Sequence, residues 1–304
     1  MLQFLIGTDF PFMRYRRIAY LISGALIAAT LVWLVMHGGP HYSVDFTGGT
    51  VLRVRADRPV AADHLRTAID QAGHHGAELQ QLTGEKANEF LIRMQTQTSG
   101  DPFPAIQQSV NAQSGAKLEL LSADAVGPKV GKELRTKAIW AVIGSLGWIL
   151  VYVGIRYEFK YALGAVVALF HDVIITLGVL CFLHREVSLT VVAALLTIAG
   201  YSINDTIVVF DRIRERSKAL RKEKHSRVMD IAVNETLSRT VITSMTVFLT
   251  AVALLVWGGE VLRDFSLAMV FGVAFGTYSS VYVASALALD TWIALDRRKG
   301  IQAE

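Results

Sequence analysis

One acidic residue, Asp205, stands inside a long apolar stretch of the sequence, residues 189–210. A charged side chain at the centre of a membrane-spanning helix costs about 2.5–3.5 kcal/mol, so a carboxyl group there needs an explanation. Thr197, Tyr201 and either Asn204 or Asp205 follow i, i+4 and i+7 or i+8 spacing, which places them on one helix face. This stripe predicts a carboxyl group that exchanges protons with a water-filled path. The alternative is an aspartate near a helix end that bonds to a neighbour and serves packing.

A cationic residue that could pair with this carboxyl group begins the next apolar stretch. Arg239 heads a second polar stripe with Thr243, Thr246 and Thr250, spaced i, i+4, i+7 and i+11. Antiparallel neighbouring helices with the two stripes face to face would bring Arg239 near Asp205, because the long arginine side chain can cover a difference in register. The pair would attract while the carboxyl group is ionised and lose that attraction once it takes up a proton, as in a gate. Taken alone, Arg239 is better explained as an anchor that reaches toward the membrane surface.

His171 and Asp172 lie together in a third apolar stretch and form another candidate proton relay. Adjacent helical residues point in different directions, so we expect only one of them to line the same path. A local hydrogen-bonded polar patch explains them equally well. The residues predicted to support the path are therefore Asn204, Tyr201, Thr243, His171 and Asp172.

Chemistry of other kinds has no support in the sequence. No metal-binding, phosphate-loop or nucleophile motif is found, and the single cysteine, Cys181, excludes an internal disulfide. We expect no hydrolytic or other enzymatic site, no metal and no cofactor.

The elements that must position these residues are apolar helices. Hydrophobic residues make up 52% of the sequence and charged residues only 18%, far from the average of soluble proteins. A membrane-spanning helix needs about 20 mostly apolar residues. Six such stretches predict a polytopic α-helical membrane protein, at residues 18–36, 138–155, 161–183, 189–210, 240–257 and 265–289.

Basic residues predict the orientation of these spans. They gather in residues 1–17, between spans two and three, in the hairpin 211–239 and in the tail 290–304, which all fall on one side. The positive-inside rule places these segments in the cytoplasm. The net charge of +4 is then a feature of topology and lipid contact, and nucleic-acid binding is the weaker interpretation.

Residues 37–137 must therefore lie on the opposite, periplasmic side as one small domain. Their pattern predicts strands at 50–55, 78–82, 89–94 and 117–124 and helices at 61–72 and 103–111. The order βαββαβ is typical of a ferredoxin-like α+β unit. Gly and Pro within residues 126–131 predict a joint before span two, either a hinge or a plain linker.

A small residue recurs at every fourth position of the sixth span. A face of this kind lets helices approach closely in lipid, and it predicts a helix–helix contact. Whether the partner helix belongs to this chain or another stays open. The residues are Ala268, Gly272, Gly276, Ser280, Ala284 and Ala288.

Several of these segments resemble the SecF family of bacterial protein export. The stretches 201–206, 210–215 and 236–244 contain the motifs Tyr-Ser-Ile-Asn-Asp-Thr, Phe-Asp-Arg-Ile-Arg-Glu and Thr-Leu-Ser-Arg-Thr-Val-Ile-Thr-Ser. Further segments that resemble the family are 44–50, 126–134, 170–173 and 258–280.

The resemblance implies a multi-pass protein of the bacterial inner membrane, related to the RND superfamily of proton-driven transporters. Its implied partners are a SecD subunit with six further spans, the SecYEG channel, a YajC-like small subunit and an unfolded preprotein. Asp205 and Arg239 occupy the motif positions that use the proton motive force to promote the late stage of export. An essential acidic residue of the family lies in SecD, so this chain alone is expected to lack a complete proton path. H⁺ is the expected coupling ion and Na⁺ the alternative.

Two other functions stay open. One is a scaffold that stabilises SecD and the SecYEG channel without conducting protons. The other is a small-molecule exporter of the RND type, which usually has two large outer domains where this sequence predicts one small domain.

Overall fold

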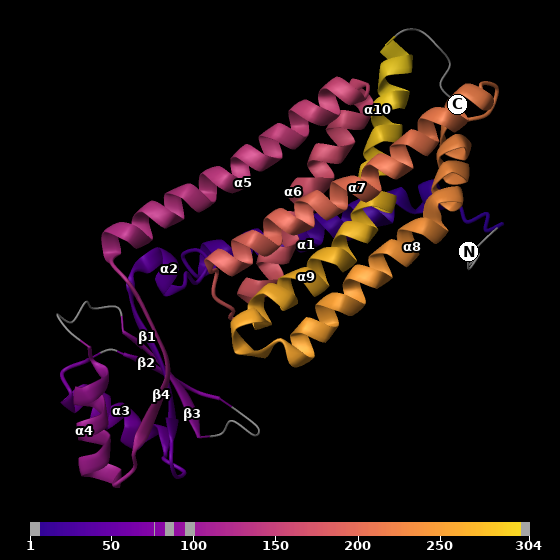
Figure 1. Cartoon of the computed structure of the whole chain (residues 1–304). Coiled ribbons are helices and arrows are strands. Elements are labelled where there is room, and N and C mark those ends of the chain that lie inside the picture. The colour runs from indigo at the N-terminus through magenta and orange to yellow at the C-terminus, as the bar shows by residue number, and fades with distance from the viewer. Residues whose placement is uncertain (1–6, 76, 83–87, 95–100, 299–304) are drawn as a thin grey trace. The chain divides into compact units, whose positions relative to one another are not determined.

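The computed structural model describes residues 7–75, 77–82, 88–94 and 101–298. Two compact units make up the chain. Residues 42–138 form an α+β unit, and the segments before and after them form a helical unit. Their elements are labelled in Figure 1.

Within the described residues, the α+β unit has the predicted βαββαβ order. Its sheet has the strand order β2-β3-β1-β4, and each neighbouring pair of strands is antiparallel. Helix α3 connects β1 to β2 across β3, and helix α4 connects β3 to β4 across β1. This arrangement confirms the ferredoxin-like prediction. The elements are β1 (Gly49–Ala56), α3 (Ala62–Gln71), β2 (Glu78–Gln81), β3 (Glu89–Met94), α4 (Phe103–Ser114) and β4 (Leu118–Val126).

The core of this unit lies between one face of the sheet and the two helices. Alternate residues of β1 and β3 are buried on that face, as the two-residue period of a strand requires. The core includes Leu52, Val54, Phe90 and Ile92 from the strands and Leu65, Ile69, Ile106 and Val110 from the helices. Charges occupy the other face, where Arg53 and Arg55 both donate to the buried carboxylate of Glu89.

A glycine turn joins the short helix α2 (Val44–Thr47) to β1. Gly48 has a φ of +75°, and a Cβ atom there would lie 2.7 Å from Cα of Pro128. Pro128 begins helix α5 (Pro128–Arg156), so only Gly127 separates β4 from α5. The predicted joint at 126–131 is therefore wrong, because residues 128–131 form the first turn of α5. Gly131 is needed there for close packing, since a Cβ atom on it would lie 2.8 Å from N of Gly48.

The helical unit confirms the prediction of a polytopic membrane protein. Within the described residues, six helices are long and apolar enough to cross a membrane. They are formed by η1 (Phe12–Tyr15) with α1 (Arg16–Met36), by α5, by α6 (Phe159–Phe182), α7 (Leu189–Ala219) and α8 (His225–Trp257), and by α9 (Gly259–Ser279) with η3 (Ser280–Ala284) and α10 (Ser285–Arg298). Helices α7 and α8 continue into the basic segment 211–239, which is mostly helical.

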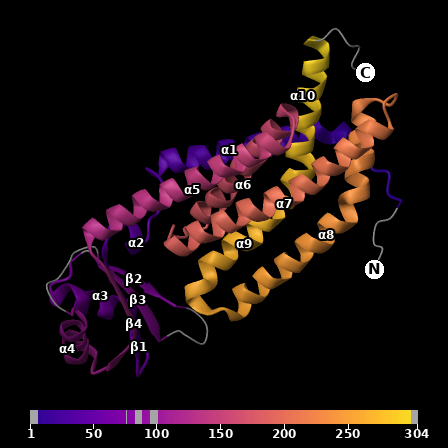
Figure 2. The same ribbon diagram turned by 45° about the horizontal axis from the view of Figure 1, so that its top comes forward.

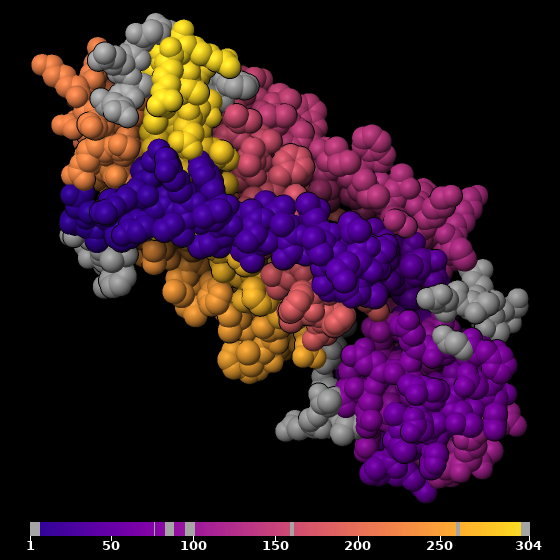
Figure 3. Space-filling model, turned by 180° about the vertical axis from the view of Figure 1, so that it is seen from behind, coloured from indigo at the N-terminus to yellow at the C-terminus, as the bar shows by residue number. Residues whose placement is uncertain are grey.

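Small residues set the packing around the last of these helices. Helices α7, α8 and α9 lie side by side (Figures 1 and 2), and α6 packs against α1, α7, α9 and α10. A Cβ atom on Gly272 would lie 2.2 Å from Cδ1 of Ile198 in α7, and one on Gly164 in α6 would lie 2.6 Å from the carbonyl oxygen of Ala284. The small-residue face therefore contacts helices of this same chain. Helix α1 runs along the surface of the unit (Figure 3).

The segment η3 between α9 and α10 is π-helical. Its wider turn leaves the carbonyl oxygen of Ser280 to accept from the hydroxyl group of Ser285, five residues on, at 2.9 Å. Single π turns of this kind inside α-helices occur frequently at functional sites.

Candidate functional site

Asp205 of α7 is buried at the contact with α8. Asp205 is 6% exposed, and the hydroxyl group of Thr240 donates to Oδ1 of its carboxyl group at 2.6 Å. The second oxygen, Oδ2, is buried without a hydrogen-bond partner among the described residues. A buried carboxyl oxygen with no partner is costly, and such exceptions occur at sites with chemical roles.

The face of α8 that meets Asp205 is not the predicted one. Thr240 and Ser244 point inward and are buried, whereas Arg239 and Thr243 are exposed on the outer side of the helix. Arg239 forms no ion pair with Asp205 in the described part of the chain. The two stripes of α8 differ by one residue, a rotation of about 100°, and the sequence could not decide which of them faces α7.

The polar stripe of α7 divides in the same way. Tyr201 is half-buried, and its hydroxyl group bonds to the Oγ atom of Ser244 at 2.8 Å. Thr277 of α9 reaches the same Ser244 atom at 2.7 Å. Asn204, by contrast, is exposed, as is Thr197. Tyr201 therefore belongs to the interior cluster, and Asn204 faces outward with Arg239.

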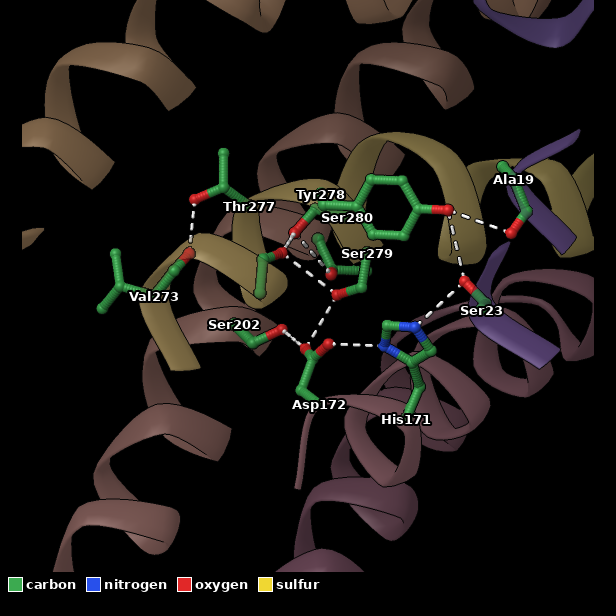
Figure 4. Close-up of polar contacts among 12 residues, drawn as sticks. Ala19, Ser23, His171, Asp172, Ser202, Val273, Thr277, Tyr278, Ser279 and Ser280 are labelled. Atoms are coloured by element: carbon green, nitrogen blue, oxygen red, sulfur yellow. Dashed lines mark hydrogen bonds and ion pairs between the residues drawn. The ribbon is translucent and has the colours of Figure 1, made fainter. Parts of the chain in front are cut away.

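His171 and Asp172 of α6 form a second, fully buried polar cluster (Figure 4). The two residues are 2% and 0% exposed, and Nδ1 of His171 lies 2.9 Å from Oδ1 of Asp172. Ser202 of α7 and Ser279 of α9 donate to Oδ2 of Asp172 at 2.5 and 2.7 Å. The two side chains bond to each other and also to different neighbours, His171 to Ser23 of α1 and Asp172 to α7 and α9. The structure therefore shows the local hydrogen-bonded patch, and the relay stays a prediction.

The two clusters meet at the junction of α9 and η3. Ser279 bonds to Asp172, and the next residue, Ser280, accepts from Thr206 at 3.4 Å. Thr206 is the sequence neighbour of Asp205. A Cβ atom on Gly276 would make ordinary van der Waals contacts here, 3.4 Å from Cβ of Ser202 and 3.7 Å from Oδ2 of Asp172.

Sequence reasoning missed the hydroxyl groups that donate to the two carboxyl groups, which are Thr240 for Asp205 and Ser202 and Ser279 for Asp172. Thr240 and Ser244 follow i and i+4 spacing, as do Ser202 and Thr206, so the sequence already places each pair on one helix face. Only the packing shows that Thr240 and Ser202 meet acidic residues.

The chemistry that this interior can support is proton exchange. Two carboxyl groups and one imidazole lie among hydroxyl groups inside a bundle of apolar helices. No group of three or more potential ligands could hold a metal ion among the residues that the structure describes. Fold and site together define a polytopic membrane protein with buried ionisable groups in its helix core.

Comparison with known families places this protein among protein-export components. Residues 106–293 match the model of the C-terminal region of the SecD/SecF protein export membrane proteins, and residues 33–60 match the SecD/SecF GG motif. The chain belongs to the SecD/SecF family. The matched GG segment contains Gly48, whose turn packs against the start of α5.

Individual relatives agree over most of the chain. The protein translocase subunit SecF of Vibrio alginolyticus is 43% identical over 284 residues, which cover 91% of this chain and 88% of the relative. The subunit SecDF of Thermus thermophilus is 41% identical, and the match covers 99% of this chain and 40% of that protein. A crystal structure of SecDF from Thermus thermophilus superposes with a TM-score of 0.85 at 39% identity, covering 95% of this chain and 39% of the solved one. The chain thus matches most of the length of a SecF subunit and part of the longer SecDF chain.

Proposed function

We propose that this chain is the SecF-type subunit of the bacterial protein-export machinery and uses the proton motive force, together with a SecD-type subunit, to promote late-stage export across the inner membrane. The SecF relatives are named protein translocase subunits, and in SecDF the SecD and SecF parts form one chain. The observation that carries the proton-coupled part is the buried carboxyl group of Asp205 with one unpartnered oxygen.

Asp205 acts as the proton carrier in this proposal. In its ionised form, it is stabilised at Oδ1 by the Thr240 hydroxyl and attracted by the charge of Arg239. Oδ2 is the oxygen left to receive a proton. Protonation removes the attraction to Arg239, and this frees the exposed guanidinium to take another partner.

The second half of the proton path comes from the SecD-type subunit. Asn204, Arg239 and Thr243 are exposed on the outer side of α7 and α8, where polar side chains at membrane depth are costly against lipid. A partner helix with an acidic residue would cover this face and pair with Arg239. The SecYEG channel, a YajC-like subunit and the unfolded preprotein complete the assembly, with the α+β unit on the periplasmic side. H⁺ is the proposed coupling ion.

Asp205→Asn tests the proton-carrier role directly. Asparagine keeps the size of the side chain and cannot be ionised, so we expect export driven by a proton gradient to be lost while the SecD-type complex still assembles. Unchanged late-stage export by an assembled Asp205→Asn complex would favour the scaffold function. Repeating the assay in a sodium gradient distinguishes the two coupling ions.

A matched pair on α8 tests the geometry of the site. Thr240→Val removes the donor to Asp205, a hydrogen bond to a charged group worth about 1.5–3 kcal/mol, so we expect export to fall about tenfold or more. Thr243→Val, on the exposed face, is the control for the same change of side chain. Equal effects of both substitutions would contradict the role of Thr240.

Arg239→Lys tests the role of the guanidinium group of Arg239. Lysine keeps the charge and loses the planar fork of the guanidinium group. We expect reduced export, because the proposed contact of Arg239 with an acidic residue of the SecD-type subunit uses this fork. Wild-type export by Arg239→Lys would mean that a bidentate contact is not needed.

A further inference from the structure

The segment before α1, residues 9–13, runs beside the first turns of α8 (Figures 1 and 2) and is called the N-terminal strap below. Asn234 of α8 binds the main chain of this strap in both directions. The backbone N–H of Phe10 donates to Oδ1 of Asn234 at 3.0 Å, and Nδ2 of Asn234 donates to the carbonyl oxygen of Phe10 at 2.9 Å. The backbone N–H of Met13 donates to Oδ1 of Asp230 at 2.8 Å. Helix α8 therefore holds the strap through its backbone.

The residues of α8 that make these contacts share one helix face. Arg227, Asp230 and Asn234 follow i, i+3 and i+7 spacing. Asp230 and Asn234 are 8% and 7% exposed, and Arg227 forms an ion pair with Asp9 at the exposed edge of the strap. A buried carboxyl or amide group that loses its hydrogen-bond partner is costly. This face of α8 is therefore committed to the strap.

The strap is itself fastened to other helices of the unit. Phe12 is 6% exposed, and the edge of its ring meets Tyr282 of η3 at a centroid distance of 5.6 Å. The strap leads through η1 into α1, where Arg16 and Tyr20 bond to Asp290 of α10 at 3.2 and 2.9 Å. The strap thus ties the start of α8 to η3, α1 and α10.

A helix that is held on one face has a fixed direction for every other face. Thr240 follows Asn234 by six residues, so the two side chains point about 120° apart around the axis of α8. While Asn234 binds Phe10, Thr240 meets Asp205. A rotation of α8 by about 100° would bring Arg239 to Asp205 instead, and it would pull Asn234 away from Phe10.

We propose that the N-terminal strap sets the rotation of α8, and that Asp230 and Asn234 are positioning residues that make Thr240 rather than Arg239 face Asp205. The inference concerns the geometry of the site and does not depend on whether Asp205 carries protons.

A second set of contacts could compete for this role. Glu235, on another side of α8, pairs with Arg212 and Arg216 of α7 at 2.6 Å each. These side chains are partly exposed, and exposed ion pairs contribute little to stability. Glu235→Gln is therefore the comparison variant in each experiment below.

Disulfide crosslinking of the full chain, reconstituted in lipid, measures the rotation of α8. The background is Cys181→Ala, which removes the native cysteine. Asp205→Cys combined with Thr240→Cys reports the observed setting, and Asp205→Cys combined with Arg239→Cys reports the rotated one. We expect the first pair to crosslink faster than the second. Breaking the strap contacts should lower the ratio of the two rates, and Glu235→Gln should leave it unchanged.

Two substitutions of Phe10 separate its backbone from its ring. Proline has no N–H group, so Phe10→Pro removes the donor to Asn234, whereas Phe10→Ala removes the same ring and keeps the donor. We expect the ratio to fall about fivefold further in Phe10→Pro than in Phe10→Ala, the effect of about one hydrogen bond. Equal ratios in the two variants would overturn the proposal. A fall in Glu235→Gln as large as that in Phe10→Pro would assign the rotation to the ion pairs and would contradict it as well.

Two substitutions of Asp230 test the second positioning residue. Asp230→Asn keeps an oxygen that can accept from Met13, and Asp230→Leu does not. The ratio should stay near its original value in Asp230→Asn and fall in Asp230→Leu, and an equal ratio in both would contradict the role of Asp230. Phe10→Pro changes no buried side chain, so it decides the question if Asp230→Leu fails to fold. The crosslinks are read without export, so a failure of the proton-carrier role of Asp205 leaves this test intact.

Discussion

Replacing Gly48 with alanine tests how the glycine turn is fastened to the start of α5. The added Cβ atom would lie 2.7 Å from Cα and 2.9 Å from N of Pro128, both backbone atoms that cannot turn away. Overpacking of this kind costs about 1–3 kcal/mol. The φ of +75° with a ψ of 161° is a backbone conformation that essentially only glycine adopts, and it adds about 1–3 kcal/mol for a residue with a Cβ atom. We expect a total loss of about 2–6 kcal/mol from the α+β unit.

Gly73 offers a matched control within the same unit. Its φ is +86°, and no heavy atom lies within 4 Å of an added Cβ atom, so Gly73→Ala should cost only the backbone part, about 1–2 kcal/mol. Hydrogen exchange of the backbone amides of the central strand β1, in the full chain, measures both losses as opening free energies. Equal losses in the two variants would refute the steric contact between Gly48 and Pro128.

Two further changes test the packing and electrostatics of the two units. Burial would raise the pKa of Glu89, but hydrogen bonds from Arg55 and Arg53 hold it below its ordinary value of 4.5. The folded state therefore binds this proton only at lower pH than the unfolded state does. The stability that Glu89 contributes is complete above about pH 4.5 and is lost as the pH falls through the pKa of the folded state. In Glu89→Gln, the opening free energy measured by hydrogen exchange of β1 should therefore depend less on pH in this range. In the helical unit, Gly164→Ala should lower the free energy of unfolding by about 1–3 kcal/mol, because the added Cβ atom would lie 2.6 Å from the carbonyl oxygen of Ala284. Gly200→Ala is the control and should cause no loss, because an added Cβ atom there has no heavy atom within 4 Å. Equal melting temperatures of the two glycine variants in detergent would contradict the close contact between α6 and η3.

Local sequence patterns were sufficient to predict the helices and strands of this protein. The apolar stretches predicted six spans, and the two-residue alternation of β1 and β3 predicted strands that the structure confirms. Both signals depend on residues close in sequence, because a helix or strand repeats its exposure within a few residues. The exception was the segment 126–131, where Gly131 predicted a joint but serves close packing against Gly48 within a helix.

Which side of each helix faces which neighbour was decided only by the tertiary structure. The sequence singled out Asp205 and His171 as buried ionisable groups, because charges in apolar stretches are conspicuous. It could not tell that Thr240 meets Asp205 while Arg239 faces outward, since a rotation of about 100° exchanges these two positions. The buried pair of His171 and Asp172 likewise bonds to Ser23, Ser202 and Ser279, which come from helices far apart in sequence. Only the packing of those helices brings these groups together.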